Sequence, residues 1–154
     1  MELEKSSPDL NSDYAYTRVL ALISRDQKIA VKQRLNLYAA LGSSDGLMPI
    51  YKQFYLGGLG TLRGYDHKEL SGSKFWMTNI EFIRQISESG ISLSAYYDLG
   101  QISGTTSKLS EQEIKQSFGL GFNLTKSFRL LFARRLDGSQ DKKIKLYLRF
   151  SSKF

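Results

Sequence analysis

Apolar and polar residues alternate with a period of two along most of this chain, and this pattern constrains the fold more than any other feature. Successive side chains of a β-strand point to opposite faces, so strict alternation predicts strands with one apolar and one polar face. Helix signals are weak throughout the sequence. The alternating segments cover residues 14–24, 28–42, 74–84, 91–101, 117–124, 128–136 and 142–154. We therefore predict an all-β chain of about seven strands.

The connections between these segments differ in length. Residues 24–27, 85–90 and 125–127 form short connections, whereas residues 43–73 and 102–113 form long ones. Short turns at one end and long loops at the other are typical of a transmembrane β-barrel. The polar faces carry small residues, tyrosines and mostly cationic groups, which suit a water-filled lumen. The pattern therefore favours an antiparallel, up-and-down transmembrane β-barrel over a soluble sandwich or barrel.

Charge and rare residue types limit the ligands that the chain can bind. The 22 Lys and Arg against 15 Asp and Glu give a net charge of +7, but no segment resembles a nucleic-acid-binding motif, so we expect no nucleic-acid partner. The chain has no cysteine and a single histidine, His67, which excludes disulfides, cysteine-ligated zinc and multi-histidine metal sites. We expect no metal and no cofactor.

The long connection contains a segment, residues 54–65, that combines four glycines, one arginine and three aromatic residues. Glycine takes positive φ and lets the backbone approach another surface closely. We therefore predict that this loop folds back onto the strands, with Gly57, Gly58 and Gly60 as its loop glycines.

Arg63 lies near the end of this segment and needs hydrogen-bond acceptors if it leaves bulk water. Glu81 and Asp98 occupy the polar faces of neighbouring predicted strands, so their side chains can come close to each other. If the loop folds inward, the two carboxylates can hold Arg63. The alternative, which the spacing leaves open, is three separate solvated charges.

Four motifs in order resemble those of one protein family. Leu62-Arg63-Gly64-Tyr65 resembles the (V/L)RG(F/Y) loop motif of the Omp85 superfamily, the bacterial surface antigen D15 group. The segment 79–83 is similar to that family's strand with a lumenal glutamate, and 96–100 to its aromatic-x-Asp-x-Gly strand. The segment 117–121 is similar to its following glycine-rich strand. The end of the chain, with Leu148, Phe150 and Phe154 in alternation, resembles its C-terminal assembly signal.

The resemblance implies both an architecture and a loop lock. The family barrel has sixteen strands, so residues 14–154 are expected to form its C-terminal part, incomplete by comparison, after an irregular lead-in at 1–13. No signal peptide is visible at the start of the chain, which fits a fragment whose remaining barrel and POTRA domains lie upstream. Inside the barrel, Arg63 with Gly64 and Tyr65 is expected to contact Glu81 and Asp98.

The resemblance also implies a location and a function. We expect an outer membrane of Gram-negative type, with the lipid bilayer and unfolded outer-membrane or secreted polypeptides as partners. The activity implied is assembly or insertion of membrane proteins or polypeptide translocation, without enzymatic chemistry and without catalytic residues. The first alternative is the barrel anchor of a patatin-like phospholipase, an enzyme that would need its Gly-x-Ser-x-Gly elbow and an Asp on an upstream domain. The second is a soluble β-barrel that binds a small apolar ligand.

Overall fold

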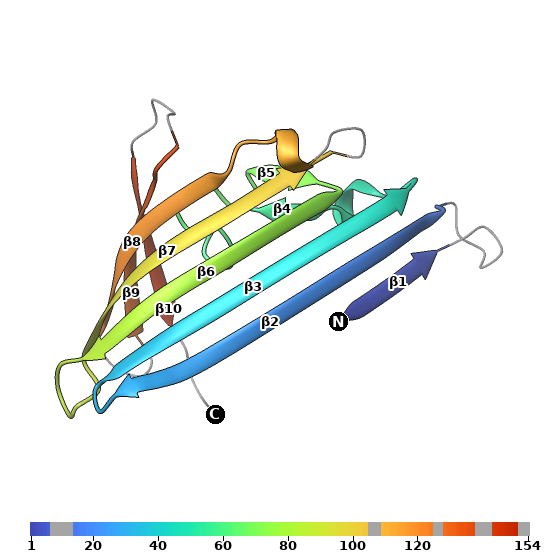
Figure 1. The fold of residues 1–154 in the computed structure, drawn as a ribbon. Coiled ribbons are helices and arrows are strands. Elements are labelled where there is room, and N and C mark those ends of the chain that lie inside the picture. The colour runs from blue at the N-terminus through green and yellow to red at the C-terminus, as the bar shows by residue number, and fades with distance from the viewer. Residues whose placement is uncertain (7–13, 105–108, 125–127, 138–142, 151–154) are drawn as a thin grey trace.

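The computed structural model describes residues 1–6, 14–104, 109–124, 128–137 and 143–150. Eight strands form one antiparallel sheet that curls so that its last strands lie behind its middle ones (Figure 1). In sheet order these are β1 (Glu2–Ser6), β2 (Tyr16–Ala30), β3 (Gln33–Gly46), β6 (Lys74–Gln85), β7 (Ser92–Ser103), β8 (Lys115–Asn123), β9 (Phe128–Arg135) and β10 (Ile144–Phe150). The prediction of an all-β, antiparallel, up-and-down fold is confirmed.

The connection between β3 and β6 departs from the simple meander. It contains a short helical turn, η2 (Ile50–Lys52), and a second, two-stranded sheet of β4 (Phe54–Leu56) and β5 (Leu70–Gly72). This loop lies inside the curve of the large sheet (Figure 1). A further helical turn, η3 (Leu109–Glu111), lies between β7 and β8. Among the residues that the structure describes, no helix has the length and apolar character needed to cross a bilayer.

The prediction for the connection between the first two long strands is wrong in its position. The turn expected at residues 24–27 is absent, because β2 continues to Ala30 and the hairpin turns at Val31 and Lys32. This end of the strand is exposed, so its polar residues reflect solvent contact and not a turn. Arg34 pairs with Asp26 across the hairpin in this register.

The lead-in is not irregular over its whole length. Residues Glu2–Ser6 form β1, which pairs antiparallel with β2. Arg18 lies 3.8 Å from a carboxylate oxygen of both Glu2 and Glu4, and the Tyr16 hydroxyl donates to Glu4 Oε1 at 2.7 Å. These polar cross-strand contacts replace the apolar alternation that makes other strands visible in the sequence. Residues 7–13 of the lead-in lie outside the described residues.

The two faces of the sheet differ in whether their apolar side chains are covered. The concave face packs against the loop around Leu56, Leu62 and Tyr65, all fully buried, together with Phe54, Phe75 and Met77. The convex face exposes large apolar side chains, including Leu41, Leu146 and Leu148 at 57% each. A soluble sheet buries such residues, whereas a barrel wall in a bilayer turns them to lipid. β1 and β10 are the two open edges of this wall in the described residues.

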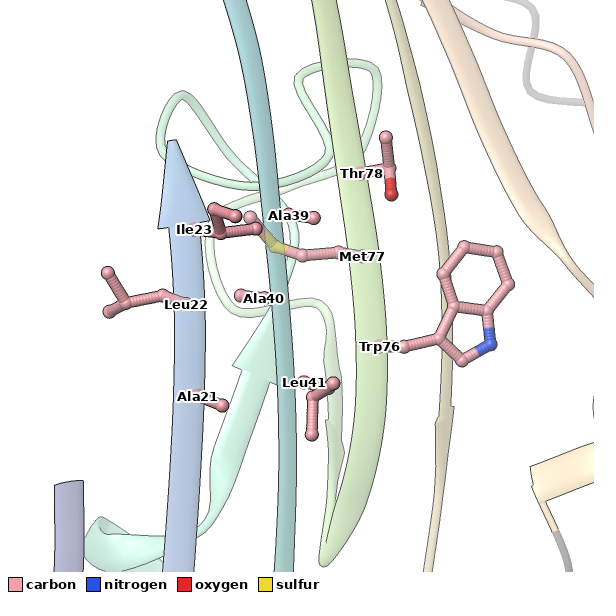
Figure 2. Close-up of a pocket in the computed structure, with 9 residues that line it drawn as sticks. All are labelled: Ala21, Leu22, Ile23, Ala39, Ala40, Leu41, Trp76, Met77 and Thr78. Atoms are coloured by element: carbon pink, nitrogen blue, oxygen red, sulfur yellow. The ribbon is translucent and has the colours of Figure 1, made fainter. Parts of the chain in front are cut away.

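An apolar depression of about 310 Å³ lies across β2, β3 and β6 (Figure 2). Small side chains, Ala21 and Ala39, form its floor beside Ile23, Leu41 and Trp76. Ile23 and Leu41 belong to the exposed convex face. The depression is therefore part of the outer surface and not the apolar interior that a soluble ligand-binding barrel needs.

Candidate functional site

The glycine-rich loop forms a compact turn that carries Arg63 toward the sheet. Gly57 and Gly58 have φ of 116° and 94°, values that favour glycine. The Gly58 N–H donates to the carbonyl oxygens of Leu62, at 3.0 Å, and of Tyr65, at 3.1 Å. These bonds close the turn on both sides of Arg63. A side chain at Gly60 would meet nothing within 4 Å, so the structure gives this third loop glycine no steric role.

Gly64 lets the loop come into contact with the opposite wall of the sheet. A Cβ atom at this position would lie 2.6 Å from the backbone nitrogen of Arg135 on β9 and 2.7 Å from Cβ of Ser117 on β8. Both distances are shorter than a carbon side chain tolerates. Close docking of the loop on β8 and β9 therefore requires glycine here.

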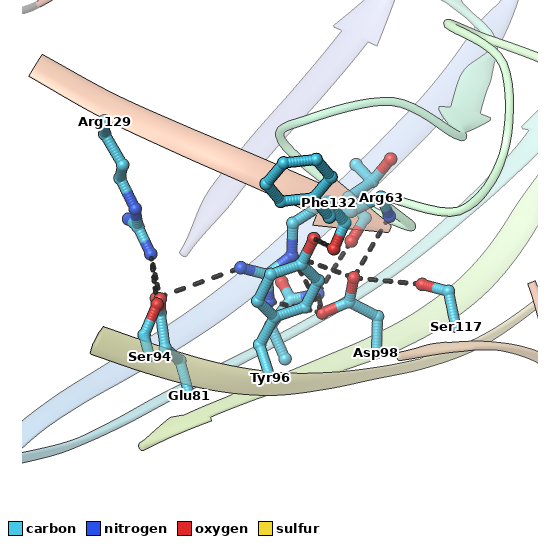
Figure 3. Close-up of polar contacts among 10 residues, drawn as sticks. Arg63, Glu81, Ser94, Tyr96, Asp98, Ser117, Arg129 and Phe132 are labelled. Atoms are coloured by element: carbon cyan, nitrogen blue, oxygen red, sulfur yellow. Dashed lines mark hydrogen bonds and ion pairs between the residues drawn. The ribbon is translucent and has the colours of Figure 1, made fainter. Parts of the chain in front are cut away.

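Arg63 and Asp98 form the centre of the site (Figure 3). Nη2 of Arg63 lies 2.5 Å from Oδ1 of Asp98, and Nε lies 2.9 Å from Oδ2. The backbone N–H of Arg63 also donates to Oδ2, at 3.0 Å. Asp98 is fully buried and Arg63 is 6% exposed, so the two charges are matched away from bulk water.

The neighbouring strands complete the hydrogen bonding of Asp98. Nδ2 of Asn79, on β6, donates to Oδ1 at 2.9 Å, and the Ser117 hydroxyl, on β8, donates to Oδ2 at 3.1 Å. The same Asn79 amide donates to the loop carbonyl of Thr61 at 2.7 Å. The carboxylate thus joins three adjacent strands and the loop in one network, which a buried charge needs to be stable.

Glu81 is near Arg63 but is not its main partner. Its Oε2 lies 3.8 Å from Nη1 of Arg63, without a hydrogen bond. The other oxygen, Oε1, accepts a hydrogen bond from Arg129 on β9. The guanidinium of Arg63 lies over the ring of Tyr96, 3.5 Å from its centroid, in a cation–π contact. The two expected carboxylates therefore hold Arg63 unequally.

Tyr65 fixes the loop at a second point. Its side chain is fully buried, and its hydroxyl donates to Oδ2 of Asp137 at 3.0 Å and accepts from the Gln116 N–H at 3.2 Å. Burial, followed by the hydrogen bond to Asp137, raises the pKa of the Tyr65 phenol above its ordinary value. The Tyr147 hydroxyl on β10 donates to the Arg63 carbonyl oxygen at 2.8 Å.

The structure brings five predicted residues, Arg63, Gly64, Tyr65, Glu81 and Asp98, to one place on the concave face. Sequence reasoning missed Asn79, Ser117, Tyr96, Arg129 and Tyr147. Asn79 and Ser117 face Asp98 directly in register on its two neighbouring strands, so pairing the predicted strands would have found them.

The C-terminal residues are separate from this site. Leu148 and Phe150 lie exposed on β10, and Phe154 lies outside the described residues. No group of three or more metal-binding side chains occurs within the described ranges.

Comparison with known proteins gives three results. The model of the Omp85 superfamily domain matches residues 3–151. Outer membrane protein assembly factor BamA of Nitratidesulfovibrio vulgaris (strain Hildenborough) is 26% identical over 95 residues, covering 53% of this chain and 12% of that protein. The solved structure of CdiB from Acinetobacter baumannii has a TM-score of 0.62 at 19% identity, over 90% of this chain and 27% of that one. This chain thus spans a small part of the length of both proteins.

An antiparallel sheet with an apolar outer face, a polar inner face and a loop held by a buried arginine defines part of an outer-membrane β-barrel. Because the family model matches nearly the whole sequence, the chain belongs to the Omp85 superfamily. The predictions of this family and of the outer membrane of a Gram-negative-type bacterium are confirmed.

Proposed function

We propose that this chain is part of a barrel that inserts β-barrel proteins into the outer membrane or moves polypeptides across it, without enzymatic chemistry. Its partners are the bilayer, unfolded polypeptides, the rest of the barrel and upstream POTRA domains. The observation that carries the proposal is the buried Arg63–Asp98 pair, which holds a long loop within the lumen. The relationship to BamA, named an outer membrane protein assembly factor, supports assembly.

The proposed role of the pair is to keep the loop in one position while the rest of the barrel handles a polypeptide. A buried ion pair is weak evidence for stability by itself, but losing one partner leaves an uncompensated charge. Release of the loop therefore separates the two charges and costs free energy, which favours the docked position of the loop. The phospholipase anchor and the soluble ligand-binding barrel receive no support from the fold or the comparisons.

The test uses cells in which the variant gene for the complete protein is the only copy expressed. Arg63→Ala is expected to lower the yield of inserted or secreted polypeptide, whereas Arg134→Ala, an exposed arginine on the convex face of β9, is the matched control. The amount of folded barrel is measured in parallel. Full activity of a folded Arg63→Ala variant would contradict the proposed mechanism, and a patatin domain encoded upstream would contradict the proposed function.

A further inference from the structure

A second pocket on the concave face lies beside the lock and contains three arginines. It has a volume of about 270 Å³ and lies between the loop and strands β3, β6, β9 and β10. We call it the arginine pocket and define it by Arg63, Arg129 and Arg149, with Asn36 and Glu81.

The positive charge of this pocket is not balanced within the described residues. Asp98 is engaged by Arg63, and Glu81 is engaged by Arg129. No carboxylate of the described residues lies within ion-pair distance of Arg149, although its guanidinium lines the pocket. Three arginines thus meet two carboxylates, and one positive charge remains.

Arg149 also occupies an unfavourable position in the sheet. It faces Arg129 directly in the antiparallel register of β9 and β10, so both side chains lie on the same face. Like charges directly opposite each other destabilise a pair of strands. Among the described residues, Arg149 has no carboxylate partner that would offset this repulsion. An anion between the two guanidinium groups would.

Two buried polar atoms at the pocket lack a partner in the described residues. The Nε–H of Arg129 is an unused donor, and Oδ1 of Asn36 is an unused acceptor. Asn36 faces Glu81 directly in the register of β3 and β6. A ligand that satisfies both atoms carries an oxyanion and an N–H donor. An acidic residue of a peptide offers both, whereas phosphate offers no N–H.

We propose that the arginine pocket binds the carboxylate of an acidic side chain in a polypeptide within the lumen. The planar guanidinium fork suits a carboxylate. Arg149 is exposed beside the half-buried Arg129, so a ligand can reach both groups. Arg129 and Glu81 lie nearer than Asp98 to the short turns of the hairpins, which face the periplasm in outer-membrane barrels. A chain entering from the periplasm therefore reaches this pocket before the Arg63–Asp98 pair. The identification of the ligand as a handled polypeptide rests on the proposed function.

The binding test uses the complete protein in detergent micelles and a short labelled peptide with one central glutamate, beside its glutamine counterpart. Wild-type protein is expected to bind the glutamate peptide about tenfold more tightly, as a charged hydrogen bond allows. Arg149→Gln is expected to abolish this preference. Arg134→Gln, the same substitution on the opposite face of the adjacent strand, is expected to keep it.

Further measurements separate binding from structure. Because Arg149→Gln removes a repulsion, its melting temperature is expected to equal or exceed that of the wild type; a lower one would indicate a structural role and overturn the proposal. Equal binding of both peptides to wild type, or equal losses in the Arg149 and Arg134 variants, would also overturn it.

A competition experiment tests the assignment of a carboxylate. Inorganic phosphate and free glutamate each compete with the labelled peptide. If phosphate displaces the peptide at a lower concentration than glutamate does, the carboxylate assignment is overturned. Peptide binding as expected beside a patatin domain encoded upstream would leave this site standing and remove the proposed function.

Discussion

Arg63 contacts Asp98 through both its guanidinium group and its own backbone N–H, so a single carboxylate holds the side chain and the main chain of the loop. This arrangement fixes where the arginine lies as well as its charge. A side-chain pair alone would allow the loop to move around its contact. Here the backbone bond at 3.0 Å prevents that movement.

The first prediction concerns removal of the Asp98 charge. Asp98→Asn keeps the shape of the side chain but leaves the Arg63 guanidinium buried without its main counter-charge. We expect the free energy of unfolding to fall by about 3–5 kcal/mol, as for other broken buried pairs. Urea unfolding of the complete protein in micelles measures this. The exposed pair of Lys32 and Glu88 is the control, and Glu88→Gln is expected to change little.

The second prediction separates the two carboxylates. Double-mutant cycles with alanine are expected to give a coupling free energy of about 2–3 kcal/mol for Arg63 with Asp98, and about 1 kcal/mol or less for Arg63 with Glu81. The reason is that Asp98 makes direct hydrogen bonds, whereas Glu81 lies 3.8 Å away and is bonded to Arg129. Equal coupling energies in the two cycles would show that both carboxylates hold Arg63 alike.

This difference between the carboxylates marks the limit of what the sequence could predict. Alternation assigns a residue to a face, and hairpin order assigns its neighbours, so the sequence placed Glu81 and Asp98 close together. The approach of Arg63 to them followed from the sequence only if the loop folds inward, which the family resemblance implied. Glu81 is on β6 and Arg129 is on β9, with β7 and β8 between them, so their contact depends on how tightly the sheet curls. Curling is a property of the whole wall and leaves no local pattern. β1 was missed for a different reason. Its residues contact β2 mainly through polar side chains, so its sequence does not alternate between apolar and polar residues.

The third prediction compares two glycines of the loop. Gly64→Ala places a Cβ atom 2.6 Å from the backbone nitrogen of Arg135, so the loop must withdraw from the sheet. We expect a loss of about 1–3 kcal/mol in docking free energy, typical of overpacking, seen as faster hydrogen exchange and proteolysis of the loop. Gly60→Ala is the matched control, since its Cβ meets nothing within 4 Å. Equal protection in both variants would mean that Gly64 does not set the approach of the loop.

The last prediction is a pH dependence from Tyr65. Its phenol has a raised pKa in the folded protein because it is buried and donates a hydrogen bond to Asp137. The protonated form is therefore favoured by folding. The contribution of the Tyr65 phenol to stability is fully present below its pKa in the unfolded chain, about 10. This contribution is lost as the pH rises from there toward its pKa in the folded protein. We expect the melting temperature of the wild type to fall more steeply above pH of about 10 than that of Tyr65→Phe, which is less stable at neutral pH because it lacks the hydrogen bond. Comparing the two proteins removes the contribution of the other tyrosines, and parallel curves would show that the Tyr65 hydroxyl is not linked to docking.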